Sequence, residues 1–181
     1  MLTKAQVKAY QNQAADMFLK AGIYITDQER EQVEIADFDL DQFEQTGLGV
    51  LVYVNTERCC AKELAMWPRQ TCPEHHHPSS GDRPGKEETF RCRWGTVYLY
   101  ESGEPTTEPI SKPPVGREHT YDVWHEIVLK PGDQYTLSPA TWHWFQSGDE
   151  GAVVSEFSST STDDTDIFTD KEIQRDTQIV D

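Results

Sequence analysis

Most of the chain beyond residue 48 consists of short apolar runs that glycine and proline clusters interrupt. The clusters include Pro84-Gly85, Pro113-Pro114 and Pro131-Gly132, and each marks a turn. Many short strands at regular spacing are typical of a β-sandwich or a β-barrel. The sequence therefore predicts a mostly β fold, with strands at 48–55, 89–94, 96–101, 124–129, 134–137, 142–147 and 152–158.

The first part of the chain predicts a helix and a short lead-in to these strands. Thr3 and Gln6 have the spacing of a capping box, and Gly22 is a stop signal, so we expect a helix over 3–21. The lead-in is completed by a short strand and a helical turn, at 33–38 and 39–45. We expect a single domain over 1–181, made of the lead-in 1–47, a barrel 48–158 and a polar segment 159–181.

The charge balance of the chain excludes some classes of partner. There are 16 basic and 32 acidic side chains, so the formal net charge is −16. Such a charge repels nucleic acid and anionic membranes, and it does nothing to attract a phosphorylated substrate. No run of roughly 18 apolar residues is present, and residues 1–15 lack the apolar core of a signal peptide. We therefore expect a cytoplasmic protein without a nucleic-acid or membrane partner.

Three histidines and a glutamate have the spacing of metal ligands. Alternate residues of a strand share a face, so His75 and His77 can point into the barrel while His76 points out. Glu88 can return beside them on the neighbouring strand, and His143 lies on a later strand. A run of histidines alone is also common on protein surfaces. Three imidazoles with a carboxylate, however, suit a divalent ion such as Mn²⁺, Fe²⁺, Co²⁺, Ni²⁺ or Zn²⁺.

This pattern resembles the two motifs of the cupin family. The first motif, His-x-His, a spacer, Glu, six residues and Gly, matches His75, His77, Glu88 and Gly95, with a longer spacer than the common version. The second normally reads Pro-x-Gly-x-x-His with a following Asn. Here it reads Pro139-Ala-Thr-Trp-His143, one residue shorter and without the Gly or the Asn. The resemblance implies an all-β cupin β-barrel (a double-stranded β-helix or jelly roll) with an added N-terminal helix.

A larger part of the chain, residues 48–170, resembles the D-lyxose isomerase family. The resemblance depends on five segments taken together: Thr71-Cys-Pro-Glu-His-His-His-Pro, Gly85-Lys-Glu-Glu-Thr-Phe-Arg-Cys-Arg-Trp-Gly, Leu129-Lys-Pro-Gly-Asp-Gln-Tyr-Thr-Leu, Thr141-Trp-His-Trp-Phe and Ser155-Glu-Phe-Ser-Ser. Members of this family are metal-dependent, usually with manganese, and usually dimeric. They interconvert D-lyxose with D-xylulose, and often D-mannose with D-fructose.

The resemblance also implies roles for particular residues. The family's metal ligands and its acid/base pair correspond to His75, His77, Glu88 and His143, and to Lys62 and Glu156. Isomerisation moves a proton between C2 and C1 through a cis-enediol, whose charge a divalent ion stabilises. In that scheme Glu156 transfers the proton, and Lys62 acts at the carbonyl oxygen. The expected substrate is a small neutral monosaccharide, and the expected assembly is a homodimer.

Three other functions suit the same ligand set. Cupin-type phosphosugar isomerases use similar ligands, but Arg91 and Arg93 alternate with Glu88, so we expect them on the outer face, away from a phosphate in the barrel. An iron-dependent cupin dioxygenase also uses three histidines and a glutamate. A metal- or sugar-binding cupin without activity would not need an acid/base pair such as Lys62 and Glu156.

Two further segments could reach a substrate in the barrel. The loop 102–120 is rich in Pro, Thr and Glu, and such loops often cover a site, although an insertion without a role has the same composition. Asp163, Asp164 and Asp166 could bind sugar hydroxyls if the C-terminal segment folds over the barrel mouth. An acidic run of this kind is more often solvated.

Overall fold

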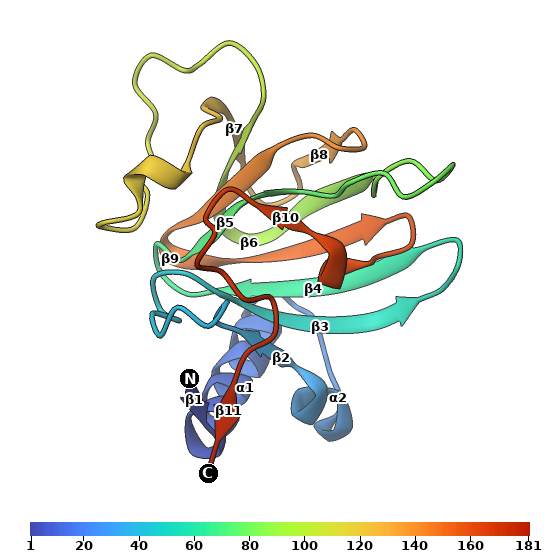
Figure 1. The fold of residues 1–181 in the computed structure, drawn as a ribbon. Coiled ribbons are helices and arrows are strands. Elements are labelled where there is room, and N and C mark those ends of the chain that lie inside the picture. Colours follow the sequence, from blue (N-terminus) through green and yellow to red (C-terminus); the bar gives the residue numbers. More distant parts are fainter.

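The strands curl into a barrel in the structure, a computed structural model that describes residues 1–181 (Figure 1). Two long strands, β6 (Glu88–Glu101) and β9 (His143–Ser158), pair with each other and run through both walls of the barrel. In one wall, the first half of β6 and the second half of β9 join β2 (Glu34–Ala36), β3 (Leu48–Asn55), β4 (Cys60–Met66) and β8 (Gln134–Leu137). In the other wall, the remaining halves join β5 (Thr71–His76), β7 (His125–Leu129) and β10 (Ile167–Phe168). The expected all-β barrel is therefore confirmed.

Glycines allow the two long strands to bend from one wall into the other. Gly95 on β6 has a φ of 75°, and Gly151 on β9 has a φ of 87°. The two residues lie so close that a Cβ on Gly95 would overlap the carbonyl oxygen of Gly151. A left-handed φ and this backbone contact both exclude a larger side chain. The glycine of the first cupin motif is thus needed where the barrel turns.

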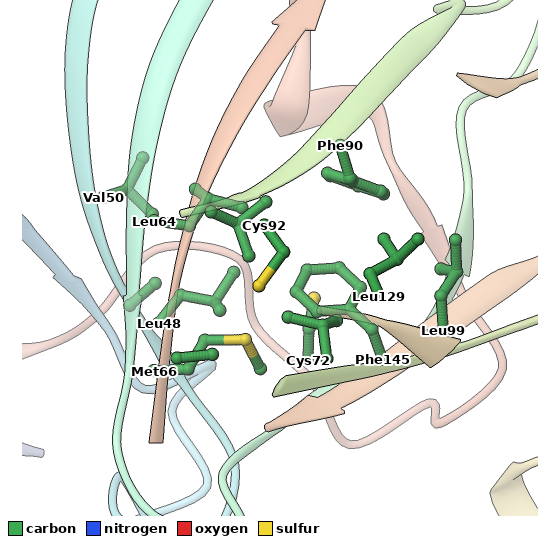
Figure 2. Packing of buried hydrophobic residues seen from close by; sticks show 14 of the residues in the cluster. Leu48, Val50, Leu64, Met66, Cys72, Phe90, Cys92, Leu99, Leu129 and Phe145 are labelled. Carbon is green, nitrogen blue, oxygen red and sulfur yellow. The ribbon is translucent and has the colours of Figure 1, made fainter. Parts of the chain in front are cut away.

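The hydrophobic core fills the space between the two walls (Figure 2). Leu64 and Phe90 enter it from the first wall, and Leu99, Leu129 and Phe145 enter it from the second. Burying each such side chain contributes about 1.5–3 kcal/mol. The packing fixes the distance between the walls, and therefore the positions of the polar side chains that the same strands carry.

Two helices cover the outer face of the first wall (Figure 1). The helix α1 (Lys4–Lys20) begins at Thr3, whose capping box with Gln6 is present as expected. Its residues Met17 and Phe18 pack against the outward side chains of β3 and β4 in a second buried cluster. The short helix α2 (Asp27–Gln32) follows. None of the helices has the length and apolar character that would let it cross a membrane.

The C-terminal tail, residues 159–181, returns along the barrel and ends beside the N-terminus (Figure 1). It forms the 3₁₀ turn η2 (Asp163–Thr165) and then β10, which pairs with β5. Its last strand, β11 (Ile179–Val180), runs parallel to β1 (Leu2–Thr3). The hydroxyl of Thr177 donates to the Ile35 carbonyl oxygen at 2.9 Å. The tail is therefore fixed to β2 and β5, and its side chains can reach the barrel interior.

The structure differs from the sequence expectations in several elements, and the helix α2 and the short strands β1, β10 and β11 were not expected at all. The segments 89–94 and 96–101 belong to the single strand β6, and 142–147 and 152–158 belong to β9, because the chain bends without leaving the sheet. The strands β4 and β5 had no strand prediction of their own. The helical turn expected at 39–45 is confined to its second half, where the amide groups of Gln45 and Thr46 both donate to the Gln42 carbonyl oxygen at 2.8 Å. The loop 102–120 is a loop as expected, with the 3₁₀ turn η1 (Glu118–Thr120) near its end.

Candidate metal centre

Four buried side chains from three strands meet at one end of the barrel core. His75 lies on β5 and pairs in register with His143, the first residue of β9. His77 lies just beyond β5, and Glu88 is the first residue of β6. One ligand atom from each of the four lies within 4.8 Å of the others. The structure thus brings together the four residues that the sequence selected as metal ligands.

The three imidazoles share one pattern of hydrogen bonds. The Nδ1 atoms of His75 and His143 lie 2.8 and 2.9 Å from backbone carbonyl oxygens two residues upstream. The Nδ1 of His77 lies 2.5 Å from a carboxylate oxygen of Asp166 on the tail. Carbonyl and carboxylate oxygens only accept hydrogen bonds, so each Nδ1 carries the proton. In the neutral form each Nε2 then keeps a free lone pair, which is the arrangement of a metal-binding histidine.

The two carboxylate oxygens of Glu88 have different partners. Oε1 lies 3.1 Å from the Nε2 of His77 and 2.9 Å from the Nε2 of His143. Oε2 lies 2.8 Å from the Nζ of Lys86, which is itself buried. Burial alone would raise the pKa of Glu88, but the charges of Lys86 and His77 hold it well below its usual range. Glu88 is therefore a carboxylate that offers one oxygen to the imidazoles.

The pKa values of the imidazoles follow from the same contacts. Burial and the neighbouring histidines hold the pKa of His75 well below its usual range, so this ring is neutral. Burial also opposes a charge on His77, but the Glu88 carboxylate and the hydrogen bonds with Asp166 and Glu88 raise its pKa to about 9. His77 therefore holds a proton at neutral pH until a cation replaces that proton.

The donor set fits a divalent metal ion. The Nε2 of His143 is buried and forms no hydrogen bond, although Oε1 of Glu88 lies 2.9 Å away, and such an atom is costly unless a ligand satisfies it. Three imidazole nitrogens with one carboxylate oxygen suit the first-row ions from manganese to zinc. The group of His75, His77, Glu88 and His143 could thus bind a divalent metal ion.

A second group of polar side chains lies beside the metal-ligand candidates. Lys62 on β4 and Glu156 on β9 are opposite each other in register, with the lysine Nζ 3.8 Å from Oε1 of the glutamate. Lys62 also donates to Ser161 at 2.9 Å and to Asp163 at 2.5 Å. Burial would lower the pKa of Lys62, but the Glu156 and Asp163 charges raise it. Lys62 and Glu156 thus form a buried ion pair facing the barrel interior.

The cavity that joins these groups has a volume of about 50 Å³. Apolar side chains of the core, such as Leu64, Phe90 and Phe145, form one side of it. The other side carries charged residues from the strands and from the tail: Lys62, His75, His77, Lys86, Glu88, Glu156, Asp163, Asp166 and Arg175. A volume of this size holds only a few water molecules, at about 10–15 Å³ for each.

Lys86 and Arg175 had no role assigned from the sequence, and for Asp166 the sequence suggested only a contact with sugar hydroxyls. Lys86 donates to Glu156 at 3.1 Å and contacts Glu88. Asp166 contacts His77, and Arg175 comes from the far end of the tail. The side chain of Lys86 comes from the loop before β6, in a segment that carries no periodic pattern. None of the three could be located from residue spacing.

The residues that line the cavity can be compared with the remaining expectations, which concern Arg91, Arg93, the loop 102–120 and the acidic residues of the tail. Neither Arg91 nor Arg93 lines it; each donates a hydrogen bond on the outer face, to Gln134 and Ser155 respectively. No residue of the loop 102–120 lines it either. Asp163 and Asp166 do line it, whereas Asp164 does not.

His76 points away from the other histidines. Its ring lies 4.2 Å, centroid to centroid, from that of Trp142. It is half-buried and does not line the cavity, whereas His75 and His77 do. The strand alternation expected for this run therefore holds, although the pairing of β5 with β9 is irregular between Cys72 and His75.

The sequence as a whole matches a known family. The model of the D-lyxose isomerase family matches residues 25–181. The chain belongs to the D-lyxose isomerase family. It is 58% identical over 181 residues to the D-lyxose/D-mannose isomerase of Thermosediminibacter oceani, covering 100% of both chains. It is 57% identical over 180 residues to the D-lyxose ketol-isomerase of a Thermofilum species, covering 99% of this chain and 100% of the other.

Solved structures support the same fold. The L-ribose isomerase of Cellulomonas parahominis superposes with a TM-score of 0.81 at 16% identity, covering 99% of this chain and 98% of the other. The L-ribose isomerase of Acinetobacter sp. DL28 in complex with L-ribose gives a TM-score of 0.82 at 18% identity, covering the same shares. At sequence identities this low, the likeness shows only that the fold is shared, and this fold is the barrel of cupin-like sugar isomerases.

Proposed function

We propose that this protein is a metal-dependent aldose–ketose isomerase that interconverts D-lyxose and D-xylulose, and also D-mannose and D-fructose. The observation that carries the proposal is the presence of two groups in one buried cavity. The first is His75, His77 and Glu88, which His143 joins from directly behind the cavity lining, and the second is the pair of Lys62 and Glu156. A protein that only bound a metal or a sugar would need the first group and not the second. The names of the relatives support the substrates.

The proposed mechanism assigns a proton to each of two residues. A divalent ion held by His75, His77, Glu88 and His143 would supply Lewis acidity toward adjacent oxygens of the sugar. Glu156 takes the proton from C2 and returns it to C1 of the resulting cis-enediol. Its Oε1 is held by Lys86 at 3.1 Å, whereas no hydrogen bond engages its Oε2, so Oε2 is the accepting atom. Lys62 donates a proton to the carbonyl oxygen at C1 as the enediol forms, and it takes the O2 proton as the C2 carbonyl forms, so it ends in its starting state.

The charges of the cavity favour a neutral sugar over a phosphorylated one. Three cations, Lys62, Lys86 and Arg175, line it, and each of them contacts at least one carboxylate. A phosphate dianion would have to compete with these carboxylates for the cations. A cavity of about 50 Å³ is also smaller than the roughly 300–1,000 Å³ of typical ligand sites, so part of its lining moves when a sugar binds.

The proposal includes properties that follow from the family. Manganese is the proposed native ion, with cobalt, iron, nickel or zinc as alternatives. We also propose that residues 1–181 act as a single domain, in a cytoplasmic homodimer without a nucleic-acid or membrane partner. Light scattering tests the assembly, and activity regained by metal-depleted protein with each ion in turn tests the metal.

One assay tests the substrate class. Manganese-loaded protein is incubated with D-lyxose, D-mannose and the 6-phosphates of mannose and fructose, and formation of the isomeric sugar is followed. We expect turnover of the free sugars and little of the phosphates. A preference for the phosphates would favour a phosphosugar isomerase, and no isomerisation with consumption of oxygen would favour a dioxygenase.

The variant Glu156→Gln tests the mechanism, because glutamine keeps the size of the side chain but cannot accept the C2 proton. We expect turnover to fall by roughly two to four orders of magnitude. Exchange of solvent deuterium into C1 or C2 should fall in parallel, while metal binding is retained. If turnover and exchange both survive, another group is the base and the assignment of Glu156 is wrong.

A further inference from the structure

The mechanism above gives no role to Arg175, although its side chain lines the cavity. The outward edge of its guanidinium faces Glu34 on β2, with Nη1 at 2.5 Å from Oε1 and Nη2 at 3.3 Å from Oε2. Planar fork-to-fork contacts of this kind fix the orientation of an arginine. The backbone on either side is also anchored, because Gln174 donates to the Phe38 carbonyl oxygen at 3.0 Å and Thr177 bonds to β2. The guanidinium is thus held in one orientation with its inner edge toward the cavity.

Asp163 faces that inner edge. Its Oδ2 lies 3.8 Å from the Nη2 of Arg175, which is too long for a hydrogen bond. The carboxylate itself is held in place by Lys62 and by the hydroxyl of Ser161. At this separation one oxygen atom can lie about 2.8 Å from both Nη2 and Oδ2. The pair therefore offers one donor and one acceptor to the same inserted group.

A sugar hydroxyl is the group that matches this pair. A hydroxyl donates one hydrogen bond and accepts others, so it can donate to Asp163 and accept from Arg175. A phosphate oxygen could accept from Arg175 but would be repelled by the adjacent carboxylates of Asp163 and Glu34. Neither Arg175 nor Asp163 contacts any of the four metal-ligand candidates. Since O1 and O2 would face the ion and Lys62, the hydroxyl that this pair can hold belongs to a later carbon of the sugar.

We propose that Arg175 and Asp163 form a hydroxyl-binding pair that holds the sugar at O3, O4 or O5 and so contributes to substrate specificity. The inference depends on the proposed isomerase function, whose substrate it describes in more detail. A substrate that lacks the hydroxyl, or has it inverted, leaves two charged groups without their shared partner. Sites built in this way discriminate strongly against such analogues.

A cycle of variants and substrates tests the pair. The values of kcat/KM are measured for wild type and Arg175→Met with D-lyxose and its 3-deoxy, 4-deoxy and 5-deoxy analogues. A hydrogen bond to a charged group is worth roughly a 10- to 100-fold change in binding. We expect a loss of that size for D-lyxose and for two analogues, mainly through KM, and a loss below about threefold for the analogue without the bound hydroxyl. The variant Asp163→Asn should single out the same analogue.

Controls separate recognition from support of the tail. Thr177→Val removes a contact between the tail and β2 without touching the cavity, so it should treat the four sugars alike. The affinity of Arg175→Met for Mn²⁺ alone, measured by calorimetry, should stay within about twofold of wild type, because Arg175 touches none of the ligands. Equal losses for all four sugars in both cavity variants would overturn the hydroxyl pair and leave the isomerase function standing. Absence of any turnover by the wild type would overturn both.

Discussion

The protonation of His77 makes a quantitative prediction about metal binding. The pKa of this imidazole is raised to about 9, so at pH 7 the metal-free protein carries a proton on it. A metal ion needs the neutral ring and must displace that proton. The two-unit gap between pH 7 and the pKa corresponds to about 2.7 kcal/mol, or about 100-fold in affinity. The dissociation constant for Mn²⁺ should therefore fall about tenfold per pH unit up to about pH 9 and then level off.

Calorimetry measures this linkage directly. Titrations of metal-free protein with Mn²⁺ under anaerobic conditions, between pH 6.5 and 8.5 in two buffers of different ionisation enthalpy, give the number of protons released. We expect about one. The control is Asp166→Asn, which removes the carboxylate from His77 Nδ1 and lowers the pKa of the ring. It should release fewer protons at pH 7, and bind the ion roughly 10- to 100-fold more weakly at pH 8.5, because the ring loses its orienting partner. An affinity for Mn²⁺ that does not change with pH would refute the reasoning.

Three further variants test the description of the barrel. His76→Ala should bind Mn²⁺ as tightly as wild type, whereas His77→Ala should lose most of its affinity, because only His77 faces Glu88. Calorimetry measures both affinities, and the reverse result would contradict the strand register. Burial raises the pKa of Glu63 from 4.5 to about 6, despite the Ser155 hydroxyl. The folded state therefore favours the protonated form of Glu63. This contribution to stability is fully present below pH 4.5 and is lost as the pH rises through 6. Glu63→Gln should therefore raise the free energy of unfolding in urea by about 1 kcal/mol at pH 7.5, half the linkage value because of screening, and leave it unchanged at pH 4.5.

The fold was predictable where local sequence and tertiary context agree. The capping box at Thr3, the Gly22 stop and the Val-rich run at 48–55 all match the structure. The strand β4 was missed because its sequence, Cys-Ala-Lys-Glu-Leu-Ala-Met, is rich in strong helix formers. Pairing with β3 and β9 on both sides overrides that preference. The strand β5 was missed because it contains Pro73, which a strand accommodates only where its ladder is irregular.

Two of the metal-ligand candidates were predictable from the alternation of side chains along an extended chain. His75 and His77 share a face with one residue between them. Glu88 was expected on the strand paired with theirs, but β6 does not pair with β5, and Glu88 reaches the histidines from the other wall of the barrel. Lys62 and Glu156 also follow this rule once β4 is known, because they are opposite each other in register. The resemblance to a family was needed to select them, since alternation alone fits many other lysines and glutamates.

The tail could not be assigned by the same reasoning, because its residues act through contacts that no repeat describes. Asp163 lies in a 3₁₀ turn, Asp166 just before β10, and Arg175 in a segment without regular structure. Each reaches the cavity only because β10 pairs with β5 and Thr177 bonds to β2. In the sequence, the two aspartates look like part of a solvated acidic run, and Arg175 stands apart from any pattern. In the folded chain they contact His77, hold Lys62 and line the cavity, so the polar C-terminal segment completes a site whose metal-ligand candidates all come from the barrel.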